Sequence, residues 1–163
     1  SEVGASLKCA PSEAVSKIEA MRDENKQLLR ELEALKEKLA GNGLDDMKKN
    51  AVEINGVTVL TGKFENADVN TLRKIGDTMK SDFDCEVCVT ASASDGKVML
   101  VCSANKKAVE KGVHCGNVVK SIAPHVGGSG GGRPDSAQAG GKDASGIDAA
   151  LESVAKVIES QLK

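Results

Sequence analysis

Residues 126–143 bring glycines and cations together in a way that suits anion binding, and they read VGGSGGGRPDSAQAGGKD. Because glycine has no Cβ, such a run can adopt left-handed conformations in which successive backbone N–H groups point into one concavity. Arg133 adds a planar bidentate donor and Lys142 adds a point charge, both suited to phosphate oxygens. The stretch therefore predicts a phosphate-binding surface loop, with a flexible Gly/Ser linker as the alternative.

The stretch does not match the standard nucleotide-binding loops. A P-loop requires glycine at 136 and Ser or Thr at 143, where the sequence has Ser136 and Asp143. The dinucleotide pattern fails because Arg133 stands where its third glycine is required. We expect Asp135 and Asp143 to stabilise the loop through side-chain hydrogen bonds to its amides, rather than to act as acids or bases.

The segment GGGRPDSAQAGGKD resembles the signature of the C-terminal domain, called C-Ala, of alanyl-tRNA synthetases. The globular part of that domain belongs to the DHH-associated domains, which also occur in a superfamily of phosphodiesterases. Those phosphodiesterases carry GGGH, whereas this chain continues with Arg133, Pro134 and Asp135 and so resembles the synthetase branch. The long polar helix expected at the N-terminus and the segment VEINGVTVLTGKF are similar to that branch as well. The resemblance thus covers nearly the whole chain.

This resemblance implies a non-catalytic module that holds the outer corner of tRNA(Ala) while the aminoacylation and editing domains of the parent chain act on it. It also implies dimerisation through the helical part and a parent enzyme that uses ATP, Mg and Zn. No cofactor is expected in the present chain. The motif gives as contact candidates Gly130, Gly131, Gly132, Arg133, Gln138, Gly140, Gly141 and Lys142. Ser129 stands where the family often has glycine, and its hydroxyl can still donate to phosphate.

The charge distribution favours the same segment, although the net charge of the chain is only −2. Residues 97–142 carry seven basic and two acidic side chains, whereas residues 51–96 carry four basic and eight acidic ones. Near an anion site this asymmetry supports a phosphate-bearing partner, although a solvated lysine-rich surface is the alternative. The absence of Tyr and Trp excludes base stacking as the main mode of binding. The electrostatic candidates are Lys106, Lys107, Lys111 and Lys120.

No arrangement of residues predicts catalysis or a metal site. There is no Asp-His-His motif for a phosphodiesterase metal centre, and His114 and His125 lack partners at ligand spacing. In a strand, the offset of three between Cys85 and Cys88 sends their side chains to opposite faces, so we expect buried thiols rather than a zinc or redox pair. The odd number of cysteines suits a reducing cytoplasm. Two alternatives stay open: the substrate-binding half of a DHH phosphodiesterase severed from its metal domain, and a pure dimerisation element.

A long helix is expected over residues 12–40, ended by Gly41–Gly43, because the stretch is rich in Glu, Lys, Leu and Ala and lacks Gly and Pro. Its heptad seam predicts either a parallel two-stranded coiled coil or docking on a helix outside this chain. Asn25 occupies an a position, where a polar residue fixes the register. The candidate dimerisation residues are Ile18, Met21, Asn25, Leu28, Leu32, Leu35 and Leu39. We expect residues 1–43 and 44–163 to form separate units.

The elements that must position the glycine stretch follow from periodicity and turn residues. We expect strands at 51–55, 57–64, 85–93 and 97–103 and helices at 68–83, 114–125 and 147–162. This alternation predicts an α/β domain, a mixed sheet covered by helices and preceded by a coiled-coil-like helix. Its core must be aliphatic, since Phe64 and Phe83 are the only aromatic residues. No apolar run approaches the ~18 residues of a membrane span, and no signal peptide is visible. The chain begins at Ser1 without Met, and we expect it to be part of a longer protein.

Overall fold

The structure is a computed structural model that describes residue 10 and residues 13–162, with the backbone alone described at 36–42. The chain forms two compact units, Ser1–Leu39 and Ala40–Lys163. Helix α2 (Ala14–Lys49) starts in the first unit and ends in the second. The start predicted for this helix, at Ser12, lies outside the described residues.

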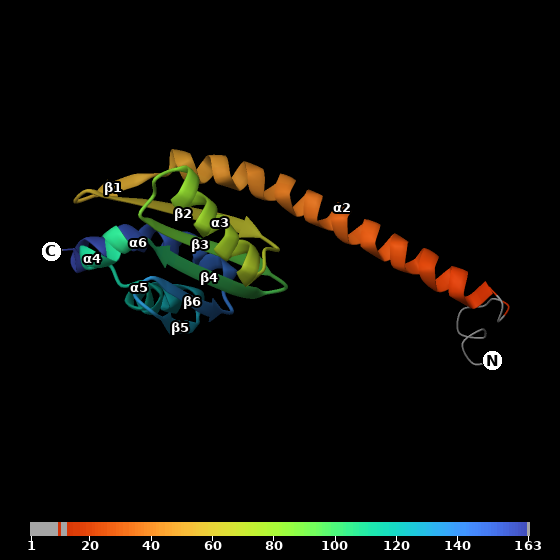
Figure 1. Ribbon diagram of the computed structural model, residues 1–163. Helices are drawn as coiled ribbons and strands as arrows, with labels where there is room; N and C mark the ends of the chain where they lie inside the picture. Colours follow the sequence, from red (N-terminus) through yellow and green to blue (C-terminus); the bar gives the residue numbers. More distant parts are fainter. Residues whose placement is uncertain (1–9, 11–12, 163) are drawn as a thin grey trace. The chain divides into compact units, whose positions relative to one another are not determined.

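The second unit is built on a mixed sheet, as the sequence predicts. In the described residues its strands follow the order β1-β2-β3-β4-β6-β5. Of the strands in the described part of the chain, only β2 and β3 run parallel, joined by helix α3 (Val69–Asp82), and the other neighbours are antiparallel (Figure 1). The strands are β1 (Val52–Ile54), β2 (Val57–Glu65), β3 (Val87–Ser94), β4 (Lys97–Ala104), β5 (Ser129–Gly132) and β6 (Ser136–Gly141).

Helices cover both faces of this sheet, and each face has its own aliphatic core. One face packs against α5 (Cys115–Ile122), the 3-10 turn η2 (Ala123–Val126) and α6 (Ile147–Gln161). The other packs against α3 and the last turns of α2, where Met47, Leu72 and Met79 are fully buried. Strand β4 is buried between β3 and β6, as the near-continuous apolar run VMLVC predicts.

Local turn and cap residues act as their types predict. The β1–β2 hairpin turns at Asn55 and Gly56, both with positive φ, as an Asn-Gly turn between strands requires. Asp68 caps α3, accepting a hydrogen bond from the Thr71 amide at 2.7 Å. The short helices α4 (Lys106–Glu110) and η3 (Ala144–Gly146) were not expected from the sequence; Asn105 caps α4, accepting from the Ala108 amide at 2.9 Å.

The prediction that Gly41–Gly43 ends the long helix is wrong, because α2 continues to Lys49. A Cβ on Gly43 would overlap the ring of Phe64, so glycine permits close packing there rather than a turn. The added turns also bury Met47 in the core beneath α3. Burying one such side chain contributes about 1.5–3 kcal/mol, which offsets the cost of roughly 1 kcal/mol for each of the two glycines, Gly41 and Gly43, inside the helix.

The expectation that Cys85 and Cys88 face opposite ways is also wrong. Strand β3 begins only at Val87, so period-two alternation does not relate the two residues. Both thiols lie in the core on the α3 face, hydrogen-bonded to each other. That hydrogen bond lowers the pKa of Cys85, and with burial it raises the pKa of Cys88 well above 9. All four described cysteines are buried free thiols, and burial is what the sequence predicts for Cys85 and Cys88.

Candidate nucleic-acid interface

The glycine stretch forms a β-hairpin rather than the loop that its composition predicts. Strands β5 and β6 pair antiparallel, with Gly130 opposite Ala139 and Gly131 opposite Gln138. In extended strands successive N–H groups point in opposite directions, so they cannot converge on one anion. At the flanks, the amides of Lys142 and Asp143 both donate to the Val126 carbonyl, at 2.8 and 3.0 Å. The anion-binding concavity predicted from the glycines is therefore absent.

Close packing explains most of the glycines instead. A Cβ on Gly130 would overlap Ala139 of the facing strand, and one on Gly141 would overlap Val126 of η2. Two positions are different. A Cβ on Gly131 would meet only the Cε atom of Lys120, at 3.3 Å, and one on Gly140 would have only the Val98 carbonyl oxygen within 4 Å, at 3.9 Å. Gly131 and Gly140 are half-buried, but the direction a side chain would take is open at both, so a partner can approach their backbone.

The turn at Arg133–Asp135 holds the hairpin to helix α5. The Cys115 amide donates to the Pro134 carbonyl at 2.9 Å, and the Gly116 amide donates to the Arg133 carbonyl at 3.2 Å. The Arg133 side chain is 77% exposed, and its Nε atom lies 3.3 Å from Oδ1 of Asp135. The cation is therefore accessible but partly neutralised within its own motif. Asp135 acts through this ion pair and Asp143 through a 3.0 Å hydrogen bond from the Ser145 amide, so neither carboxylate holds the glycine amides as expected.

The predicted contact residues do not gather at one point. Arg133 and Lys142 flank opposite ends of β6, whose six residues span about 20 Å, so they cannot grip the same phosphate. Lys120 lies beside Gly131. Lys111 lies at the opposite edge of the sheet, where its Nζ atom donates to the Gly56 carbonyl at 2.6 Å. The remaining candidates, Lys106 and Lys107, lie on α4, where Lys106 is 3.9 Å from Glu110.

Sequence reading missed Arg73, which the fold brings to the middle of β6. Its Nη2 atom donates to Oε1 of Gln138 at 2.8 Å. The two residues are 65 positions apart, and no local spacing signals their meeting. A cavity of about 210 Å³ opens beside this pair, lined by Arg73, Asp77, Lys80, Ser103, Ala104, Asp135 and Ser136.

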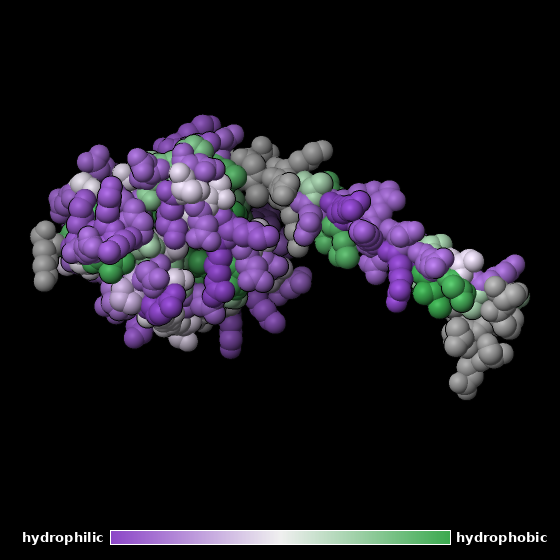
Figure 2. Space-filling model, viewed as in Figure 1, coloured by the Kyte–Doolittle hydropathy of each residue, from purple (hydrophilic) through white to green (hydrophobic). Residues whose placement is uncertain are grey.

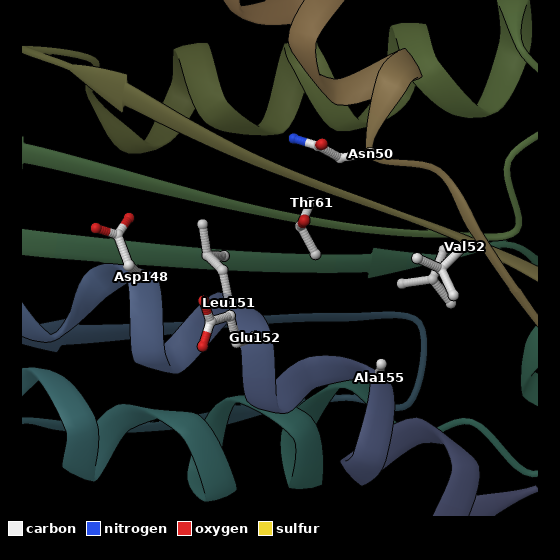
Figure 3. A pocket seen from close by; sticks show the side chains of 8 residues that line it. Asn50, Val52, Thr61, Asp148, Leu151, Glu152 and Ala155 are labelled. Atoms are coloured by element: carbon white, nitrogen blue, oxygen red, sulfur yellow. The ribbon is translucent and has the colours of Figure 1, made fainter.

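A larger cavity of about 390 Å³ lies between strands β1 and β2 and helix α6, away from the hairpin (Figure 3). Val52, Leu151 and Ala155 form part of its apolar lining. Its charged side chains are Asp148 and Glu152, and Asp148 is paired with Lys63 at 3.1 Å. These carboxylates suit no phosphate-bearing ligand.

Neither histidine has a catalytic arrangement in the described residues. His114 caps α5, its Nδ1 atom accepting from the Asn117 amide at 3.2 Å. Across the described ranges, no three His, Cys, Asp or Glu side chains lie close enough together to hold a metal ion. In the same residues, none of the helices combines the length and apolar character that crossing a membrane requires.

The first unit carries an exposed apolar stripe along α2, visible as separate green patches in Figure 2. Met21 is 52% exposed, Leu28 57% and Leu35 57%, and Ile18 and Leu32 are exposed as well. Asn25 is exposed on the same helix. The side chain of Leu39, the last predicted seam residue, lies outside the described residues.

Comparison with known proteins shows which family and which proteins this chain is similar to. The family model described as the DHHA1 domain matches residues 56–160. Alanine–tRNA ligase of Acetivibrio thermocellus is 49% identical over 156 residues, and that of Clostridioides difficile is 40% identical over 163 residues. The alignments cover 96% and 100% of this chain but 18% of each relative, so the chain spans less than a fifth of the proteins it matches.

Among solved structures, the chain is similar to the C-Ala domain of alanyl-tRNA synthetase from Aquifex aeolicus. The TM-score is 0.61 at 26% sequence identity, over 67% of this chain and 97% of that one. The match covers almost all of the Aquifex domain and confirms the resemblance seen in the sequence.

Proposed function

This chain belongs to the DHHA1 domain family, and we propose that it is the part of an alanine–tRNA ligase that holds tRNA(Ala). In this role it performs no chemistry itself. It keeps the tRNA attached while the aminoacylation and editing domains of the parent chain, which uses ATP, Mg and Zn, act on it. The 49% identity to an alanine–tRNA ligase across 96% of the chain carries the proposal.

The hairpin face supports RNA as the partner. Arg133, Lys120 and Lys142 are exposed along β5 and β6, and Gly131 and Gly140 leave bare backbone between them. Cations spread along about 20 Å suit a polyanion that presents several phosphates, whereas a single nucleotide would need them to converge. Lys106, Lys107 and Lys111 lie on or directly after α4 and contribute long-range attraction rather than contacts in the same row.

The first unit has a different role in this proposal, which is association. The exposed seam of α2 needs an apolar partner, because large apolar side chains repeated at heptad spacing are seldom left in water. A second copy of the chain, giving a homodimer through residues 12–40, supplies the matching seam. Buried free thiols fit a protein of the reducing cytoplasm.

Binding of a tRNA(Ala) transcript at two salt concentrations tests the proposal most directly. We expect saturable binding whose logarithmic affinity falls linearly with logarithmic salt, because binding releases counterions from phosphates. A phosphodiesterase half would instead bind short linear dinucleotides in preference to tRNA. A pure dimerisation element would bind neither, and that outcome would remove the RNA-holding role.

A further inference from the structure

Gln138 is held on the α3 face of β6 by the residues on either side of it. Ala137 and Ala139 are buried on the opposite face, beneath α5 and α6. Side chains alternate along a strand, so Gln138 must project toward α3. Its backbone is paired on both sides, with Val101 of β4 and Gly131 of β5. The position and direction of this side chain are therefore fixed by the sheet.

The hydrogen bond from Arg73 decides which atoms Gln138 has left for a ligand. A guanidinium carries only donors, so the amide atom facing it must be the oxygen, and the 2.8 Å contact uses one of the two lone pairs of that oxygen. The amide nitrogen then remains to donate outward. Arg73 and Gln138 together therefore offer mainly donors, namely the remaining guanidinium N–H groups and the amide NH₂ group.

Arg73 also keeps its full charge, in contrast to the neighbouring cations. Arg133 lies 3.3 Å from the carboxylate of Asp135, and Lys80 lies 3.4 Å from that of Asp77. Across the described residues, no carboxylate oxygen lies within 4.0 Å of a nitrogen of the Arg73 guanidinium, which donates its hydrogen bond to a neutral amide. A hydrogen bond to a neutral acceptor orients the guanidinium without cancelling its charge.

Space for a ligand exists beside this pair. The position of Gly140, two residues along β6 on the same face as Gln138, is open on that face, with no atom but the Val98 carbonyl oxygen within 4 Å of a Cβ placed there. The cavity of about 210 Å³ on the other side, toward Ser136, is also lined by the carboxylates of Asp77 and Asp135, so a phosphate must approach Arg73 from the Gly140 side. Arg73 is itself exposed at this point.

From these four observations we infer that Arg73 is a phosphate-binding residue of this domain, oriented by Gln138. A site in which donors predominate favours a ligand made of acceptors, and a phosphodiester of the RNA backbone is the acceptor group that the proposed function supplies. The inference rests on that proposed function. Arg73 adds a cation at the middle of β6, between Arg133 and Lys142 at the two ends of that strand. Together these three side chains can contact successive phosphates of one RNA strand that lies along the hairpin.

Charge removal at two adjacent positions of α3 tests the inference. Arg73→Ala should weaken binding of the tRNA(Ala) transcript about tenfold and reduce the salt slope by roughly one unit, as loss of one phosphate contact requires. Lys74→Ala is the matched control, because Lys74 is the next residue, is also exposed, and lies about 100° around the helix. It should change affinity less than twofold.

Gln138→Glu and Arg73→Lys test separately the orientation of the Arg73 guanidinium and its positive charge. A carboxylate at 138 would pair with Arg73 and repel phosphate, so the loss should equal or exceed that of Arg73→Ala, with the salt slope lowered as well. Arg73→Lys, which keeps the charge but loses the planar fork, should retain the slope and lose part of the affinity. Thermal melting confirms that each variant is folded.

The outcomes distinguish this inference from the proposed function. If Arg133→Ala weakens tRNA binding while Arg73→Ala and Lys74→Ala both stay within twofold of the unmodified chain, the inference is overturned and the proposed function stands. If the unmodified chain does not bind the transcript at all, both are overturned. A loss for Arg73→Ala that leaves the salt slope unchanged would make Arg73 a structural residue and also overturn the inference.

Discussion

Gly116 in the first turn of α5 lies against the backbone of Gly132 at the end of β5, so closely that a Cβ on Gly116 would overlap the Gly132 carbonyl oxygen. The same helix end donates its amides to the carbonyls of Arg133 and Pro134. Glycines on two elements thus let a helix terminus sit directly on a hairpin and hold its turn in place. The glycines of the motif therefore have a structural role, which is to fix the position of Arg133.

This contact predicts that Gly116→Ala destabilises the domain. Alanine is normally favoured over glycine in a helix by about 0.5–1 kcal/mol, but here its Cβ must displace backbone, at a cost of about 1–3 kcal/mol for overpacking. We expect a net loss of stability and a melting temperature lowered by several degrees. Gly140→Ala is the control, since a Cβ there has open space, and it should melt within a degree or two of the unmodified chain. Equal melting of the two variants would refute the close packing.

The ion pair within the motif predicts opposite effects at its two members. Arg133→Ala removes an exposed cation and should weaken tRNA binding by about 1–2 kcal/mol, with a salt slope reduced by roughly one unit. Asp135→Asn frees Arg133 from its carboxylate at 3.3 Å and should strengthen binding. The backbone carbonyl of Asp135, which accepts from the Ala104 amide, is unchanged by that substitution. Filter binding at two salt concentrations measures both, and weaker binding by Asp135→Asn would contradict the assignment of Arg133 as a phosphate ligand.

Most of the helices and strands can be predicted from the sequence, because turn residues and helix caps act on the backbone within a few positions of themselves. Asn55–Gly56 and Asp95–Gly96 set their hairpins through positive φ, and Asp68 and Asn105 cap helices through one hydrogen bond each. The apolar spacing over residues 68–83 predicts one inward face made of Val69, Leu72, Ile75, Met79 and Phe83. Leu72, Ile75 and Met79 are buried there, whereas Val69 is half-buried. Phe83, placed on that face by periodicity, instead ends the helix 41% exposed beneath the ammonium group of Lys48, 3.9 Å from the ring centroid.

What local signals miss is set by contacts between distant residues. Glycine at 43 reads as a helix end until the ring of Phe64 is placed against it, and glycines at 130 and 141 read as a loop until Ala139 and Val126 are placed against them. The meeting of Arg73 with Gln138 depends on α3 and β6 packing on one sheet. In each case the residue type alone is compatible with two structures, for example a glycine with either a turn or a close contact. Tertiary packing decides between them.

The heptad seam predicts a dimer that can be tested at Asn25. In a parallel two-stranded coil Asn25 faces its own copy, and Asn25→Ile should raise the melting temperature while allowing trimers or tetramers. If α2 instead docks on a segment outside this chain, both proteins should sediment as monomers. Sedimentation equilibrium of the two decides, with Lys26→Ile, at the neighbouring exposed position outside the seam, as the control. A monomeric unmodified chain at high concentration removes the dimer proposal.

Buried thiols predict a loss of stability in alkali. The hydrogen bond with Cys115, together with burial, raises the pKa of Cys102 well above 9. The folded protein therefore retains a thiol proton that the unfolded chain releases from about pH 9 upward. Stability present below pH 9 is lost as pH rises toward the folded pKa, at a slope on the order of 1 kcal/mol per pH unit for one group. Cys102→Ala should be less stable at pH 7, because it leaves a cavity, but its stability should fall less steeply from pH 9 to 10.5. Parallel urea curves for the two proteins across that range would contradict the shift.

A substitution at Gly131 should reduce tRNA binding without reducing the stability of the fold. Its φ is not in the left-handed region, and a Cβ there meets only the flexible Cε of Lys120, so Gly131→Val should fold with a melting temperature close to that of the unmodified chain. A β-branched residue is also favoured in a strand. The same side chain would nevertheless stand on the half-buried backbone of β5 beside Lys120, where an RNA strand must approach, and should weaken tRNA binding about tenfold. Because no cation is removed, the salt slope should stay unchanged, unlike that of Arg133→Ala.

Gly140→Val should behave in the same way, since Gly140 is open on β6. If both valine variants bind tRNA as the unmodified chain does, the RNA does not lie on the hairpin, and the contact surface must be sought on α4 or along α2.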